Sequence, residues 1–111
     1  MSDLAAARRQ LAIKSGVVKR LAKEHALYKK EAEEQQRKLD KFIADGAEAW
    51  DIKNATRMME EANKMIVDSA NRLGKAAGEL KDLIDAGKAN PELAHDEELL
   101  KAEKILEESG A

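Results

Sequence analysis

Apolar residues recur at alternating spacings of three and four along two long stretches of the chain. The first stretch runs from about Leu4 to Ala44. Nine of its twelve repeat positions are apolar: Leu4, Ala7, Leu11, Val18, Leu21, Tyr28, Ala32, Leu39 and Phe42. The three polar exceptions are Lys14, His25 and Gln35. A repeat of this length predicts a long helix with a coiled-coil-like seam.

The second stretch, about residues 50–86, carries the same repeat, and Ser69 is its only polar position. The other seam positions are Ile52, Ala55, Met59, Ala62, Ile66, Leu73, Ala76, Leu80 and Leu83. Asp45-Gly46 predicts the end of the first helix and Gly87 the end of the second. A third, shorter helix is predicted over about 91–108, with Asn90 as N-cap and Pro91 at its first position.

The two long helices can fold onto each other about the loop 45–49. Pairing residues whose numbers sum to 94 matches the seams in every layer, from Phe42 opposite Ile52 onward. In this register His25 faces Ser69, the one polar residue of the second seam. Gly16 falls opposite the stretch that holds Gly74 and Gly78, which predicts a close approach of the two helix backbones.

The fold class predicted is all-α: one elongated, antiparallel three-helix bundle over residues 1–111. The short helix is expected beside the N-terminal half of the first helix and the C-terminal half of the second. Its seven acids would then lie near six bases of the first helix, namely Arg8, Arg9, Lys14, Lys19, Arg20 and Lys23. Pairing with the third helix is the favoured interpretation of this basic segment, and an acidic protein partner is the alternative.

Composition and charge exclude several classes of function. The chain has no cysteine, so disulfides, thiolate metal sites and a cysteine nucleophile are excluded. Its apolar runs fall short of the roughly 20 residues that span a bilayer, and its first residues lack a signal-peptide core. The chain is net acidic and has few aromatics, which disfavours nucleic-acid or membrane binding. These features predict a cytoplasmic protein that binds another protein and is no enzyme.

No candidate catalytic or cofactor-binding feature of the sequence has the residue spacing that its chemistry requires. His25 and His95 lie far apart, without a nucleophile signature or a metal-ligand spacing, so neither a metal nor a cofactor is expected. The stretch from Gly74 to Gly78 lacks the order of a phosphate-binding loop and follows no strand. The methionines Met58, Met59 and Met65 suit either core filling or a partner surface.

One stretch of the first helix is more specific than its heptads. It reads Ile13-Lys14-Ser15-Gly16-Val17-Val18-Lys19-Arg20-Leu21, and the second helix continues with Met58-Met59-Glu60-Glu61 and Met65-Ile66-Val67-Asp68. Over about residues 10–85 the chain resembles the tubulin-binding cofactor A family. The resemblance implies a cytosolic, cytoskeleton-associated three-helix chaperone that captures quasi-native β-tubulin without ATP or metal. Such a chaperone holds β-tubulin for assembly with α-tubulin. It also implies other tubulin-folding cofactors as possible partners and leaves monomer and homodimer open.

The tubulin-contacting face implied by the resemblance consists of outward residues of the two long helices. Because tubulin is acidic, the bases are the candidates, with Tyr28 at the edge: Lys19, Arg20, Lys23, Tyr28, Lys30, Lys53 and Arg57. Many relatives have proline where this chain has Val67, which should leave the second helix straighter. The alternative function is a three-helix adaptor module with a different protein partner.

Overall fold

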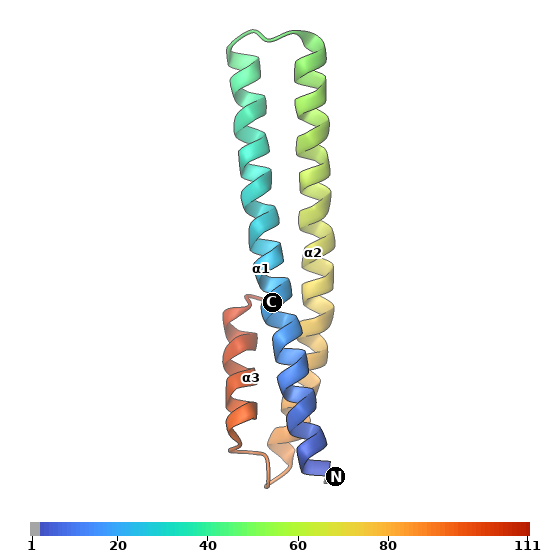
Figure 1. Ribbon diagram of the computed structural model, residues 1–111, viewed down its shortest axis with the longest axis vertical. Coiled ribbons are helices and arrows are strands. Elements are labelled where there is room, and N and C mark those ends of the chain that lie inside the picture. The colour runs from blue at the N-terminus through green and yellow to red at the C-terminus, as the bar shows by residue number, and fades with distance from the viewer. Residues whose placement is uncertain (1–2) are drawn as a thin grey trace. The chain divides into compact units, whose positions relative to one another are not determined.

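The computed structural model describes residues 3–111, and within this range the chain forms α-helices and no strand. The helices are α1 (Asp3–Ala44), α2 (Ala49–Ala89) and α3 (Glu97–Glu108) (Figure 1). The all-α, three-helix fold predicted from the sequence is therefore confirmed. Within residues 3–111, no helix combines the length and the apolar character needed to cross a bilayer.

The chain divides into two compact units, and α1 and α2 contribute to both. Unit 1 combines the chain up to Lys23 with Arg72–Ala111 and contains all of α3. Unit 2 is the segment Glu24–Asn71, which holds the end of α1, the connecting turn and the start of α2. The number of domains stays a prediction.

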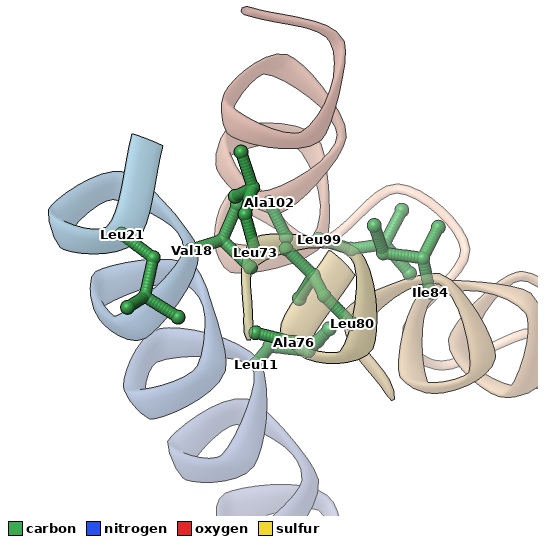
Figure 2. Close-up of a cluster of buried hydrophobic side chains, with 9 residues drawn as sticks. All are labelled: Leu11, Val18, Leu21, Leu73, Ala76, Leu80, Ile84, Leu99 and Ala102. Atoms are coloured by element: carbon green, nitrogen blue, oxygen red, sulfur yellow. The ribbon is translucent and has the colours of Figure 1, made fainter. Parts of the chain in front are cut away.

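The hydrophobic core of unit 1 draws on all three helices (Figure 2). Its buried members are Leu11, Val18 and Leu21 from α1, Leu73, Ala76, Leu80 and Ile84 from α2, and Leu99 and Ala102 from α3. Within this unit α3 lies beside both long helices, as predicted (Figure 1). Apart from Ile84, the core members from α1 and α2 are seam positions, because the 3-4 repeat keeps these positions on one side of each helix.

The predicted end of α2 and the predicted start of α3 are both wrong. Helix α2 continues through Gly87 to Ala89, and Gly87 is buried. A Cβ at Gly87 would lie 2.5 Å from Leu99 Cδ1, so this glycine lets α3 pack closely against α2. It serves as a packing position within the helix and does not end it.

Helix α3 begins at Glu97, six residues after the predicted start at Pro91. Asn90 does begin a turn, since its carbonyl accepts from the N–H groups of Leu93 and Ala94 at 2.9 Å each. The N-cap of α3 is Asp96, whose side chain accepts from Glu98 N at 2.9 Å. The turn in between places Leu93 in the interior, where it is 3% exposed. Residues 91–95, which sequence reasoning had included in the third helix, therefore form a turn that buries Leu93.

The prediction that Gly16, Gly74 and Gly78 permit close helix packing is also wrong. All three are exposed, and a Cβ at each would meet nothing within 4 Å. A glycine inside an exposed helix costs roughly 0.5–1 kcal/mol relative to alanine. The fold gains no contact in return at these positions.

Unit 2 is an antiparallel pair of helical segments joined by residues 45–48 (Figure 1). Gly46 has φ +67°, the left-handed conformation that a glycine adopts without strain, and it closes the turn. Few of the unit's residues are buried: Ala32, Leu39, Ala55 and Ser69. Inside the seam His25 Nδ1 lies 2.7 Å from Ser69 Oγ, so the predicted polar pair is confirmed.

Candidate protein-binding surfaces

The predicted partner-binding bases of unit 1 lie on the exposed side of α1. Lys19, Arg20 and Lys23 are exposed, and so is Arg9. Lys19 and Lys23 form no ion pair with any other residue between 3 and 111. Their charge is therefore available to a partner.

The predicted pairing of these bases with the acids of the third helix is mostly wrong. Arg8 Nε does bond to Asp96 Oδ2 at 2.6 Å. Lys14, however, pairs with Glu79 of α2, and Glu103 of α3 pairs with Lys88 of α2 at 3.0 Å. Because α3 begins six residues later than predicted, its carboxylates meet α2 and their own helix more than the bases of α1.

Two of these contacts change carboxyl pKa values. The hydrogen bond from the Arg8 guanidinium lowers the pKa of Asp96, and the backbone N–H of Glu98 adds to the effect. The hydrogen bond from Lys14 lowers the pKa of Glu79. Both carboxyl groups therefore stay ionised to a lower pH than usual, and each pairs with a base of α1.

The remaining predicted residues belong to unit 2. Lys30 on α1 is exposed, as are Lys53 and Arg57, which lie one turn apart on α2. Arg57 Nη2 donates to Asn54 Oδ1 at 3.4 Å, and Tyr28 is half-buried. The partner-binding role of these residues stays a prediction.

Large exposed apolar side chains are the feature that sequence reasoning missed. Ile13 in unit 1 is 51% exposed, and in unit 2 Leu27 and Trp50 are 58% and 67% exposed. None of the three occupies a position of the 3-4 repeat. An apolar residue outside the seam of an otherwise polar helix was the signal that could have identified them.

The methionines divide between the two roles considered for them. Met58 and Met65 are 45% and 36% exposed, whereas Met59 is half-buried in the seam. Val67 is 61% exposed on the outer side of α2, where it lines a shallow groove with Glu60, Asn63, Lys64, Asp68 and Asn71. Helix α2 is uninterrupted at Val67 because a valine, unlike a proline, retains the N–H that the helix needs.

The histidines form no catalytic or metal-binding arrangement in residues 3–111. His25 contacts Ser69 in the seam, and His95 is exposed in the turn before α3. No three His, Asp or Glu side chains of the described range are grouped so that they could hold a metal ion. The chemistry on the surface is that of charged and apolar protein contact.

Comparison with known proteins identifies the family. Residues 6–106 match the family described as Tubulin binding cofactor A. The chain belongs to this family. Chicken (Gallus gallus) tubulin-specific chaperone A is 41% identical over 99 residues, which cover 89% of each chain. The human (Homo sapiens) protein of that name is 38% identical over the same share.

Solved structures of cofactor A proteins have the same fold. The structure named human tubulin chaperone cofactor a matches with a TM-score of 0.81 and 35% identity, over 95% of this chain and 99% of that one. Tubulin folding cofactor A from Arabidopsis thaliana matches with a TM-score of 0.89 and 28% identity, over 96% and 97%. The resemblance stated from the sequence is thus confirmed across nearly the whole chain.

Proposed function

We propose that this cofactor A family member is a tubulin chaperone that captures quasi-native β-tubulin and holds it, without nucleotide, for assembly with α-tubulin. The observation that carries the proposal is the family match over residues 6–106, together with relatives named tubulin-specific chaperone A. The proposal includes a cytoplasmic, cytoskeleton-associated location and no catalytic activity.

The surface chemistry supports reversible protein binding. Exposed bases on both long helices offer many modest electrostatic contacts, and such contacts favour fast association and ready release. Exposed apolar side chains such as Ile13 and Leu27 lie on the same helix as several of these bases and can add desolvated contact area. A holding chaperone needs this combination because its client has to leave intact.

A native-gel shift tests the proposal. β-Tubulin and, separately, α-tubulin are released from the cytosolic chaperonin and titrated with the protein, with nucleotide removed after release. A shift with β-tubulin alone, unchanged by nucleotide removal, is expected. No shift with either subunit, while circular dichroism shows an intact helical protein, would refute the proposal and favour an adaptor with another partner.

Charge reversal tests the predicted contact residues in unit 2. Lys53→Glu combined with Arg57→Glu is expected to weaken the β-tubulin shift, because both side chains are exposed and one turn apart. Lys101→Glu combined with Lys104→Glu on α3, where both lysines are exposed, serves as the control with the same change of net charge. Equal loss of binding in both variants would indicate a general charge effect and argue against these residues as contacts.

A further inference from the structure

One surface of unit 1 combines exposed bases, an exposed apolar side chain and an unfilled space. We define the outer α1 patch as Arg9, Ile13, Gly16, Arg20 and Lys23, all of which are exposed. At 3.6 residues per turn, these positions lie within roughly 40° of the direction opposite Val18. Val18 is 0% exposed in the core, so the patch points directly away from the rest of unit 1.

The ionisable residues of the patch are all bases, namely Arg9, Arg20 and Lys23. The segment from Leu4 to Lys23 contains six bases and no acid. Arg8 and Lys14 of this segment pair with Asp96 and Glu79. Arg9 and Lys23 of the patch lie on the opposite side of the helix from the core and face solvent, and Arg20 beside them is exposed but already interacts within the chain.

Ile13 and Gly16 give the patch an apolar centre that a partner can approach closely. Ile13 is 51% exposed among these bases, and a Cβ at Gly16 would meet nothing within 4 Å. Small residues at a helix contact allow the shorter interaxial distances of helix packing. The folded chain makes no use of the space at Gly16, although glycine weakens the helix there.

The packing of α3 within unit 1 is an example of the kind of ligand that suits exposed bases around an apolar residue. It is a 12-residue acidic amphipathic helix whose Leu99 and Ala102 are buried against the long helices. Ion pairs lie before and after these residues along the chain, Arg8–Asp96 before Leu99 and Lys88–Glu103 after Ala102. The outer α1 patch has the matching features, a central apolar residue and flanking bases, on a face that no helix of unit 1 covers.

We propose that the outer α1 patch binds an acidic amphipathic helix of the tubulin client. Ile13 contacts the apolar stripe of that helix, Gly16 allows its backbone to approach, and Arg9 and Lys23 pair with its carboxylates. The inference rests on the proposed function, since it names the client segment that the chaperone recognises. A protein helix suits the patch better than a nucleic acid because the patch has no aromatic side chain on which bases could stack.

Two pairs of matched variants test the patch by native-gel titration with β-tubulin. Ile13→Ser is expected to weaken binding about tenfold, as loss of a central apolar contact does. Leu100→Ser removes a similarly exposed apolar side chain, 54% exposed on α3, and should change binding less than about twofold. Gly16→Leu fills the open space and should also weaken binding about tenfold, whereas Gly78→Leu on α2 should not.

The absence of cysteine allows the partner segment to be mapped directly. Ile13→Cys labelled with a photoreactive maleimide should crosslink to a helical, acid-rich segment of β-tubulin, and Leu100→Cys should not. A crosslink to a basic or non-helical segment would overturn the inference. Ile13-dependent binding to anionic vesicles with no effect on the β-tubulin titration would overturn it as well.

The outcomes separate the two proposals. If the unmodified protein shifts β-tubulin but Ile13→Ser and Gly16→Leu bind within about twofold of it, this inference alone is wrong. If the unmodified protein produces no shift, the proposed function and the inference both fail. Circular dichroism on each variant excludes unfolding as the cause, because both substitutions lie on an exposed helix face.

Discussion

Replacing Gly87 by alanine tests how closely α3 packs against α2. The new Cβ would lie 2.5 Å from Leu99 Cδ1, and Leu99 is 0% exposed, so its side chain has little room to move. Overpacking of a filled core costs about 1–3 kcal/mol. Alanine regains up to about 1 kcal/mol of helix propensity over glycine. We therefore expect Gly87→Ala to destabilise the protein by about 1 kcal/mol.

Gly78→Ala is the matched control for this prediction. A Cβ there meets nothing within 4 Å, so only the propensity gain remains and stability should rise by about 0.5–1 kcal/mol. Urea unfolding followed by circular dichroism at 222 nm measures both variants and Leu99→Ala in the Gly87→Ala background. A favourable coupling between positions 87 and 99 is expected, because the smaller side chain makes room for the Cβ.

The reasoning would be refuted by either of two results. One is a Gly87→Ala protein at least as stable as Gly78→Ala, since this would mean that α3 does not press on Gly87. The other is a zero coupling energy between positions 87 and 99, since the cost would then have another origin. Hydrogen exchange of the α3 amides in Gly87→Ala locates the damage, which should concentrate in that helix.

Three further predictions concern the polar pairs and the two units. Ser69 Oγ donates its hydrogen to Ile66 O at 3.0 Å, so it accepts one from His25 Nδ1–H. Ser69→Ala should therefore lower the free energy of unfolding in urea by about 1–3 kcal/mol, because the half-buried imidazole N–H loses its acceptor. Adding His25→Leu should restore most of that loss. Failure of the double variant to recover would contradict a pairwise origin. Arg8 holds the pKa of Asp96 in the folded state below its ordinary 3.8, so the folded protein binds fewer protons than the unfolded one as the pH falls. The stability that this pair contributes is therefore complete above about pH 3.8 and is lost as the pH falls through the lower pKa of the folded state. Asp96→Asn, which can still cap α3, should make the urea midpoint depend less on pH between about pH 5 and pH 2. An unchanged pH dependence would contradict this assignment. Native-state hydrogen exchange should be slower at core amides of unit 1 than in unit 2, which has few buried residues, and uniform protection would argue against that difference.

Several features followed from the sequence because they depend on neighbours along the chain. The 3-4 repeat placed the seam positions of α1 and α2, and Asp45-Gly46 marked the turn between them. The register that opposed His25 to Ser69 was also correct, since a polar residue in a seam requires a polar partner at the same level. The stretch around Gly16 carried the resemblance that the family match confirmed.

Only the tertiary structure could show the contacts that the third helix makes with the other two and the features that depend on them. The sequence predicted the start of α3 at Pro91, whereas the structure caps this helix with Asp96 and buries Leu93 in the turn before it. All of the glycines inside the long helices look alike, yet only Gly87 meets a neighbouring side chain. The sequence offers several acids to the bases of α1. The position of α3 brings Asp96 to Arg8, and the packing of α2 against α1 brings Glu79 to Lys14. The sequence by itself determines the helices and their shared seam, because periodicity and capping are local; which side chains meet the third helix is decided only in three dimensions, because that contact joins residues far apart in the chain.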